Sequence, residues 1–464
     1  MELSGIKKAG FYPIDGETYG QPFPEGVGGC AGFRIPGLIK LSDGALFATT
    51  DARYDCPGED CGGIDTMFAL STDGGERWTA GYAAYFPDSL GTPGDLRDAT
   101  ICIDPMPVET PDGTLHIFVN LGPTGVTTAL KWPGAGSGFI NVEGVRRLAV
   151  TDDLAHADSS PESFPYYIGD PSDGFSPVID RANGENTGFA VDGFFNLYRV
   201  SADGFEALTQ PQTDTGSRIV QNLFYRDSEL HVYNTMYTLQ VSSEDRGKTW
   251  NWRLVSIKLQ DETGVISSPG NGLVTSDGVV VLPFYAMDPD ISVLRSFLVF
   301  SEDNGNSFFR SSYVPSVAEI PNSSESKPVE LPDGTLRLFF RSSTRRICYA
   351  DYDRTENLWS EPKALPVLVH SDCNFGALAR GDRIFIAYAR GVGACARSRS
   401  HGRIYVFRTD EHKKMLLYDV FPVTDDAFSY AVLADVDPST LAVLYDTCAD
   451  GKVIFKKIAA DSSE

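Results

Sequence analysis

Four arginines in this chain lie beside short β-rich segments, where together they could bind a small anion. They are Arg34, Arg53, Arg341 and Arg399. A guanidinium offers paired N–H donors that match a carboxylate, which a lysine ammonium does not. Three acidic residues and one tyrosine occupy similar places in the sequence: Asp60, Asp104, Glu325 and Tyr430. Taken singly, each is most often a surface charge, a turn residue or part of the core, so the elements that position them decide whether they act together.

Those elements are hairpins of one recurring shape, in which two β-rich runs flank a turn that contains Asp or Gly. The shape occurs six times, beginning near Gly37, Asp104, Gly270, Ser326, Asn374 and Tyr430. Four of the turns are Asp-Gly pairs, the strongest short hairpin signal: Asp43, Asp112, Asp277 and Asp333. The repeat predicts an all-β fold, a six-bladed β-propeller whose radial closure protects the strand edges. An irregular sandwich with repeated hairpins is the alternative.

One interval, from the turn at Asp112 to the turn at Asp277, is far longer than the others. It predicts a β-rich insertion in blade 2. The expected organisation is blade 1 and the start of blade 2 over residues 1–129, the inserted subdomain over 130–228, and the rest of the propeller over 229–464.

A second repeat supports the count of blades. The pattern S-x-D-x-G-x-x-W occurs at Ser71–Trp78 and Ser243–Trp250, and at Ser301–Phe308 with Phe in the last place. Asp and Gly suit a tight turn, Ser and Asp side chains can bind its amides, and the aromatic residue can pack beneath it. We interpret these Asp boxes as structural turns between the third and fourth strands of their blades.

The hairpin topology sorts the polar residues by face. The Asp-Gly turns lie at one end of the predicted propeller, so the start of each first strand and the end of each second strand lie at the other. The candidate arginines, Asp60, Asp104, Glu325 and Tyr430 all map to that second end, around the central channel. A small anion should therefore bind there.

The order of these motifs resembles the exo-α-sialidase (neuraminidase) family, the Asp-box sialidases, and particularly its bacterial members. Phe33-Arg-Ile-Pro36 is followed by Asp51-Ala-Arg53, an Asp box, an insertion, two more Asp boxes, and then Glu325, Arg341, Arg399 and Tyr430. The resemblance covers most of the chain outside the insertion. It implies terminal α-linked sialic acids on glycans or glycoconjugates as substrate and partner, and no cofactor or metal.

The resemblance also implies a role for each residue. Arg34, Arg341 and Arg399 would hold the substrate carboxylate. Tyr430 would be the nucleophile and Glu325 its base. Asp60 would be the acid/base, with Asp55 and Glu59 as rivals because the loop after Tyr54 departs from the usual pattern. Arg53 and Asp104 would contact the substrate.

The implied chemistry explains the tyrosine. A carboxylate nucleophile would meet the negative charge beside the anomeric carbon of a sialic acid, and sialidases use tyrosine instead. A phenol with a pKa near 10 needs a base within hydrogen-bond reach. Clustered arginines need carboxylates to balance them, and Asp104, Glu325 and Asp446 are candidates.

Three functions stay open. The first is hydrolysis by an exo-sialidase with retention of configuration. The second is an intramolecular trans-sialidase or a glycosidase of a related nonulosonic acid. The third, from another class, is a sialic-acid-binding propeller without catalysis, which would not need Tyr430, Glu325 and Asp60 together.

Composition excludes other classes. Asp plus Glu number 63 and Lys plus Arg 39, so the net charge of −24 argues against nucleic acid or an anionic membrane as a partner. No apolar run is long enough to span a membrane. The chain starts without an apolar signal core, so it is either cytoplasmic or, as we expect, secreted or surface-bound with its signal removed. Cys56 and Cys61 are close enough in the sequence to form a disulfide. None of the eight cysteines has the spacing of a metal site.

Overall fold

The protein is all-β, as the sequence predicts. The computed structural model describes residues 6–54, 60, 62–89, 99–127, 131–212, 217–288, 292–365, 372–391, 399–410 and 412–460. In these ranges the helices are short 3-10 turns: Val27–Gly29, Pro87–Ser89, Leu154–Asp158, Pro161–Ser163 and Cys448–Asp450. Within the same described ranges, no helix has the length and apolar character to cross a membrane.

A nine-stranded sheet carries the first two hairpins. Its first part is β1 (Gly10–Tyr19), β2 (Gly32–Lys40), β3 (Leu46–Arg53), β4 (Ile64–Ser71) and β5 (Arg77–Tyr85). Its second part is β6 (Ile101–Glu109), β7 (Leu115–Gly122), β18 (Tyr237–Ser243) and β19 (Asn251–Val255). Neighbours pair antiparallel within each part, and one parallel bridge between Ile64 and Ile101 joins the two.

Four smaller antiparallel sheets follow along the chain. The first contains β20 (Thr263–Ser267), β21 (Leu273–Val274), β22 (Val280–Met287), β23 (Leu294–Ser301) and β24 (Phe309–Arg310). The second contains β25 (Ser326–Glu330), β26 (Leu336–Arg341), β27 (Ile347–Asp353), β28 (Leu358–Trp359) and β29 (Lys363–Ala364). The third contains β30 (Gly376–Arg380), β31 (Arg383–Ala389), β32 (Ser400–Thr409) and β33 (Met415–Ala427), and the last contains β34 (Ala431–Asp437), β35 (Thr440–Asp446) and β36 (Val453–Ala459).

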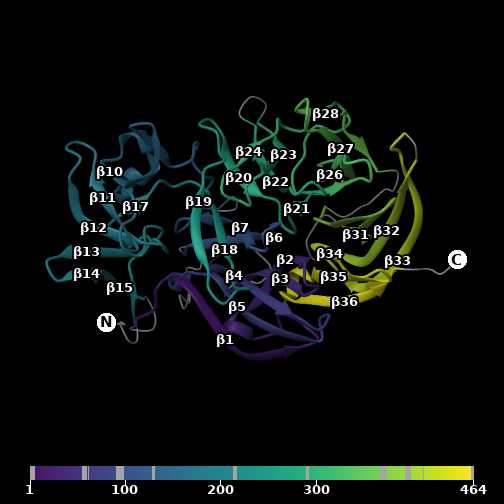
Figure 1. Ribbon diagram of the computed structural model, residues 1–464, viewed down its shortest axis with the longest axis horizontal. Helices are drawn as coiled ribbons and strands as arrows, with labels where there is room; N and C mark the ends of the chain where they lie inside the picture. Colours follow the sequence, from purple (N-terminus) through teal and green to yellow (C-terminus); the bar gives the residue numbers. More distant parts are fainter. Residues whose placement is uncertain are drawn as a thin grey trace.

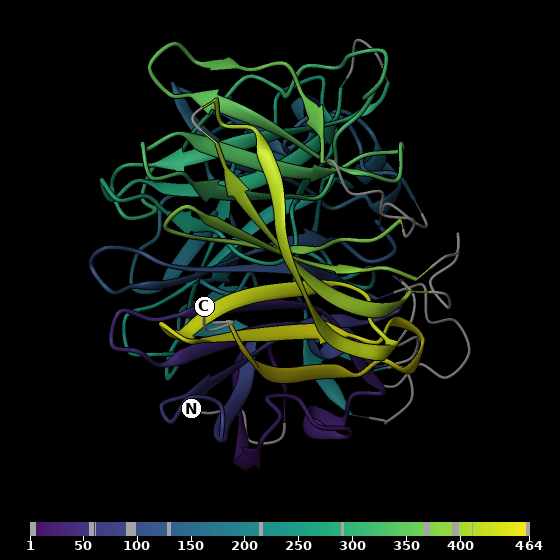
Figure 2. The ribbon, with the colours of Figure 1, turned by 90° about the vertical axis from the view of Figure 1, so that its right-hand side faces the viewer.

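The sheets have a propeller-like arrangement, because their inner strands contact one another in a closed series. Strand β2 contacts β6, β6 contacts β20 and β21, β22 contacts β25, and β25, β30 and β34 follow in order. Strand β34 contacts β2 and completes the series. In Figures 1 and 2 the yellow C-terminal strands accordingly lie beside the purple N-terminal strands. Trp78 packs edge-on against Phe455 across this junction, with ring centroids 5.3 Å apart.

A separate eight-stranded sheet lies between β7 and β18 in the sequence and to the left in Figure 1. Its strands are β8 (Phe139–Val142), β9 (Val145–Thr151), β10 (Tyr166–Ile168), β11 (Phe175–Asp180), β12 (Asn186–Asp192), β13 (Leu197–Ser201), β14 (Gly204–Ala207) and β17 (His231–Val232). A two-stranded ladder, β15 (Thr209–Pro211) with β16 (Arg218–Val220), accompanies it. The sheet reaches Val232, slightly beyond the expected segment 130–228.

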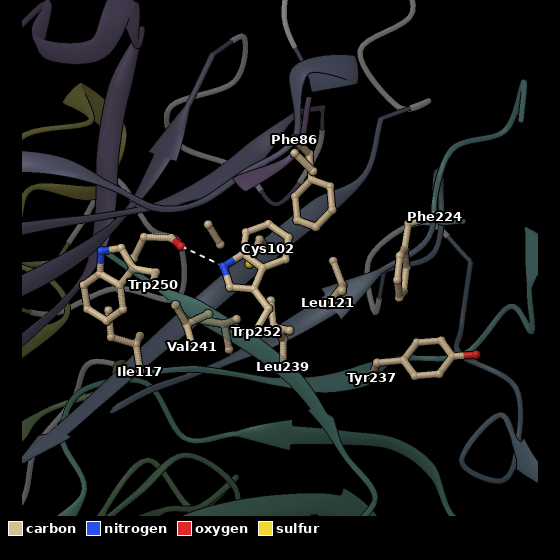
Figure 3. Packing of buried hydrophobic residues seen from close by; sticks show 14 of the residues in the cluster. Phe86, Cys102, Ile117, Leu121, Phe224, Tyr237, Leu239, Val241, Trp250 and Trp252 are labelled. Carbon is tan, nitrogen blue, oxygen red and sulfur yellow. Dashed lines mark hydrogen bonds between the residues drawn. The ribbon is translucent and has the colours of Figure 1, made fainter. Parts of the chain in front are cut away.

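One hydrophobic core joins this sheet to the nine-stranded sheet. Within this core Trp252 of β19 packs against Phe86, which follows β5, with ring centroids 5.2 Å apart (Figure 3). The Trp252 ring also contacts Phe194, which precedes β13, at 5.1 Å between centroids. Its indole N–H donates to the Ala83 carbonyl at 3.0 Å, so the buried polar group is satisfied. The eight-stranded sheet is therefore packed on the larger sheet.

The Asp boxes form the turns that their sequences predict. In each, the Ser Oγ accepts a hydrogen bond from the backbone N–H of the Gly four residues later. The distance is 2.9 Å for Ser71 and 2.8 Å for Ser243 and Ser301. Gly247 has φ of +83°, and a Cβ there would lie 2.7 Å from the Phe68 ring, so only glycine fits. The turns join β4 to β5, β18 to β19 and β23 to β24.

This geometry predicts a measurable stability loss. Ser243→Ala leaves the amide of Gly247 unpaired in a buried turn, which should lower the free energy of unfolding by about 1–3 kcal/mol. The matched control Ser201→Ala changes an exposed serine and should cost less than about 0.5 kcal/mol. Urea denaturation measures both, and equal effects would contradict the structural role of the box.

Candidate functional site

The structure brings the three arginines of the expected carboxylate clamp to one place. Arg34 lies on β2, Arg341 ends β26, and Arg399 immediately precedes β32. Glu325 and Tyr430 immediately precede β25 and β34. All five lie at the ends of hairpins opposite the Asp-Gly turns, as the topology predicts. They come from four different sheets, so a single interaction site depends on how those sheets are arranged.

Tyr430 lies at the centre of the cluster. Its hydroxyl donates to Glu325 Oε1 at 2.5 Å. Arg341 Nη1 donates to Glu325 Oε2 at 2.9 Å and to the Tyr430 hydroxyl at 3.4 Å. The guanidinium carbons of Arg34 and Arg399 lie 5.3 and 5.4 Å from the centre of the Tyr430 ring. One phenol thus faces one carboxylate and three cations.

These charges act on the phenol in opposite directions. Burial and then the neighbouring Glu325 carboxylate raise the pKa of Tyr430 well above its ordinary value, against the lowering effect of the three guanidiniums. Tyr430 is therefore a neutral phenol at neutral pH. Its hydrogen bond to Glu325 gives the proton an acceptor if the oxygen attacks an electrophile.

Carboxylates balance the clustered arginines. Asp446, which ends β35, is fully buried and accepts Arg34 Nε at 3.3 Å, as well as the amide of Ile35 at 3.1 Å. Asp446 is one of the three counter-ions expected from the sequence. Although burial disfavours the charged form of Arg34, the Asp446 carboxylate holds the pKa of Arg34 above its ordinary value.

Asp372 is a counter-ion that the sequence analysis missed. Its Oδ1 accepts Arg341 Nε at 2.7 Å, and its backbone carbonyl accepts Arg399 Nη2 at 2.7 Å. It links two of the three arginines. Asp372 immediately precedes the hairpin that begins near Asn374, at the same end as the other candidates. This position could have identified it from the sequence.

A second cluster lies beside the first and contains the other predicted residues. Arg53, which ends β3 and is fully buried, donates from Nη2 to Asp51 Oδ2 and to Asp60 Oδ1, both at 2.8 Å. Asp51 Oδ1 accepts the amide of Asp104 at 3.0 Å, and Asn120 donates to Asp104 Oδ2 at 3.1 Å. Burial raises the pKa of Asp104 well above its ordinary value, and the nearby carboxyl of Asp51 adds to this.

Solvent reaches Asp60, with 43% of its side chain exposed. Its rivals Asp55 and Glu59 lie outside the described residues, as do Cys56 and Cys61 and the disulfide considered for them. The role of Asp60 stays a prediction.

Irregular backbone aims several of these side chains. Ile35, Asp104 and His401 have φ of 58°, 63° and 56°, and each lies at a break in strand register. A β-bulge turns the side chains near it away from the regular alternation of a strand. Arg34, Asp104 and Arg399 are at or next to these breaks, which sequence pattern alone does not reveal.

Residues of both clusters line one narrow pocket of about 70 Å³, although Arg53, Arg341 and Arg399 are not among its lining residues. Arg34, Asp60, Asp104, Glu325 and Tyr430 form its polar wall. Isoleucines at 101, 103 and 266 together with Met236 supply an apolar wall. Such a pocket suits a small amphipathic anion. In the described ranges, no group of three or more His, Cys, Asp or Glu side chains is placed to hold a metal ion.

Comparison with known proteins finds similarity to sialidases. Residues 213–418 match the model of the BNR repeat-like domain. The anhydrosialidase of Macrobdella decora is 26% identical over 361 residues, which cover 71% of this chain and 45% of that protein. Sialidase B of Streptococcus pneumoniae is 25% identical over 340 residues, covering 67% of this chain and 45% of that protein. The chain thus spans about half the length of these relatives.

Solved structures show the same fold. The intramolecular trans-sialidase of Ruminococcus gnavus superposes with a TM-score of 0.77 at 23% identity, over 92% of this chain and 94% of that one. The NanB sialidase of Streptococcus pneumoniae gives a TM-score of 0.79 at 20% identity, over 94% of this chain and 69% of that one. The resemblance to bacterial sialidases expected from the sequence motifs is confirmed.

The buried ion pair of Arg34 gives a testable prediction. Asp446→Ala leaves the Arg34 guanidinium without this carboxylate in a buried site, which should lower the free energy of unfolding by about 3–5 kcal/mol. The matched control Asp170→Ala removes an exposed partner of Arg147 and should change stability little. Thermal and urea denaturation of both variants check this, and a small loss for Asp446→Ala would show that the pair does not organise the site.

Proposed function

We propose that this chain is a retaining exo-sialidase, a glycosidase that hydrolyses terminal α-linked sialic acids from glycans and glycoconjugates. The observation that carries the proposal is the Tyr430 hydroxyl, hydrogen-bonded to Glu325 and faced by Arg34, Arg341 and Arg399. A binding protein would need the cations but not a phenol paired with a base.

The three arginines are proposed to hold the substrate carboxylate. Guanidiniums bind a carboxylate through paired, charge-assisted hydrogen bonds. With the carboxylate held, the anomeric carbon would lie beside the Tyr430 oxygen, and fixed orientation lowers the entropic part of the barrier. A neutral phenol avoids the repulsion that a carboxylate nucleophile would meet from the same substrate group.

Cleavage would proceed in two displacements. In the first, Glu325 takes the phenol proton, the Tyr430 oxygen bonds to the anomeric carbon, and Asp60 gives its proton to the leaving glycosidic oxygen. In the second, Asp60 takes a proton from water, whose oxygen attacks the anomeric carbon, and the Tyr430 oxygen leaves and recovers its proton from Glu325. Two inversions at one carbon retain its configuration.

Arg53 and Asp104 are the remaining predicted substrate contacts. Asp104 lines the pocket, and its neutral carboxyl could donate a hydrogen bond to a ring substituent. Arg53 is fully buried and reaches the pocket through the Asp60 carboxylate that it holds.

The proposed scaffold is a six-bladed propeller with a β-rich insertion in blade 2, divided near residues 129 and 228. The closed series of contacts through β2, β6, the sheet of β20 to β22, β25, β30 and β34 supports six blades. The antiparallel pairing of β7 with β18, on either side of the eight-stranded sheet, supports an insertion.

Intramolecular trans-sialidase activity is the second candidate. It is favoured by the similarity to the anhydrosialidase of Macrobdella decora and to the Ruminococcus gnavus enzyme. In this reaction a hydroxyl of the bound sialic acid would replace water in the second displacement and leave an anhydro sugar. The proposed site residues are the same for both reactions.

Product analysis separates the two candidates. Incubation with an aryl α-sialoside and with sialyllactose, followed by NMR over time, should first show free sialic acid in the α configuration, because two displacements retain it. An anhydro sugar as first product would favour the intramolecular reaction. A first product in the β configuration would contradict the double displacement, and binding without turnover would contradict an enzyme.

The nucleophile is tested by Tyr430→Phe. This variant keeps the ring between Arg34 and Arg399 but removes the attacking oxygen, so kcat should fall by at least about 100-fold. The affinity for sialic acid, measured by calorimetry, should change little because the arginines stay. Tyr418→Phe, which changes an exposed tyrosine on β33, serves as the matched control, and near-normal turnover by Tyr430→Phe would remove Tyr430 from the role.

A further inference from the structure

Asp51 is a buried residue behind the pocket that the proposed mechanism does not use. It lies on β3 with no exposed surface, and each of its carboxyl oxygens has a partner. Oδ2 accepts Arg53 Nη2 at 2.8 Å, and Oδ1 accepts the backbone amide of Asp104 at 3.0 Å. The buried Asp51 side chain is therefore linked to two acidic residues of the pocket: to Asp60 through Arg53, and to Asp104 through its backbone amide.

The link to Asp60 passes through a single nitrogen. Arg53 Nη2 donates to Asp51 Oδ2 on its buried side and to Asp60 Oδ1 on its pocket side, at 2.8 Å in each case. Asp60 belongs to the connection between β3 and β4 and is 43% exposed. Without a partner, an exposed side chain on such a connection would lose several rotamers on reaching its working position, which costs free energy at each turnover.

The link to Asp104 passes through its backbone. Asp104 has φ of 63°, a conformation that costs a non-glycine residue free energy unless its surroundings hold it. The hydrogen bond from its amide to Asp51 supplies such support. The register of β6 breaks here, and the side chain of Asp104 points to the pocket.

We propose that Asp51 is a positioning residue for the glycosidic cleavage: through Arg53 it holds Asp60 so that the leaving oxygen is protonated efficiently, and through the backbone amide it holds Asp104, the proposed substrate contact. This inference rests on the proposed function. Asp51 does not touch the substrate, and its effect is on where the proton donor lies.

The contacts of Asp51 do not require a full negative charge. Burial raises the pKa of Asp51 to about 7, against the lowering effect of Arg53, and the nearby Asp60 carboxyl adds to the rise. An amide oxygen could replace one of the two acceptors, so Asp51→Asn should keep part of the function that Asp51→Ala loses.

The test compares substrates that differ in their need for an acid. Sialyllactose has a poor leaving group that must be protonated, whereas an aryl sialoside with an acidic phenol leaves unaided. General-acid catalysis is worth about 100- to 10,000-fold, so Asp51→Ala should lower kcat/KM for sialyllactose by about 100-fold and for the aryl substrate by less than about 5-fold. Asp51→Asn should lie between wild type and Asp51→Ala for sialyllactose.

A matched control separates positioning from general damage. Asp351→Ala breaks another carboxylate pair with a buried arginine, Arg337, near the turn at Asp333. It should leave the ratio of the two kcat/KM values unchanged. In a double-mutant cycle, Asp51→Ala should not change the ratio further once Asp60→Asn is present.

Two results would overturn the inference. One is an equal loss on both substrates in Asp51→Ala, and the other is a full additional change of the ratio in the Asp60→Asn background. If Asp51→Ala does not fold, Arg53→Lys tests the same link and should shift the ratio in the same direction; an unchanged ratio in that variant also overturns the inference. Absence of turnover by the wild-type protein on both substrates would overturn the proposed function itself, whereas an active wild type with an unchanged ratio overturns the inference alone.

Discussion

The site depends on bringing three guanidiniums around one phenol without leaving their charge unbalanced. Like charges at this distance repel, and burial removes the water that would screen them. Asp446 pairs with Arg34, Glu325 with Arg341, and Asp372 with Arg341 through its side chain and with Arg399 through its carbonyl. These carboxylates make the clustering possible, yet leave guanidinium faces directed at Tyr430. A bound anion would find cations that are already oriented.

The sheets supply that orientation because the residues enter at corresponding strand ends. Tyr430 and Arg399 each immediately precede a strand, β34 and β32, while Arg341 ends β26. Adjacent inner strands contact one another in a closed series, so their ends surround one axis. The Asp boxes join outer strands in two of the sheets, twice in the nine-stranded sheet and once between β23 and β24, and the same geometry of Ser, Asp and Gly closes each turn. The Asp-box turns thus lie on outer strands, whereas the candidate site residues lie at strand ends around the centre.

Local departures from regular strands refine the site. The register breaks at Ile35, Asp104 and His401 each carry a non-glycine residue with positive φ. Such conformations persist because tertiary contacts hold them, and Asp446 binding the amide of Ile35 is one example. Asp51 has the same relation to the amide of Asp104. Buried carboxylates therefore support backbone as well as balance charge.

The sequence alone determined the all-β class, the hairpin turns at Asp43, Asp112, Asp277 and Asp333, and the Asp boxes, because these follow from contacts within a few residues. It also placed Arg34, Arg341, Arg399, Glu325 and Tyr430 at one end of their hairpins, since strand direction alternates predictably at each turn. Only the tertiary structure decided which of them touch, that Arg53 is buried beneath Asp60, and that Asp51 and Asp372 complete the two clusters. The contacts around Tyr430 join residues from different sheets, and those of Asp51 join separate strands of one sheet. No pattern along a single strand specifies the register breaks and packing that create either set.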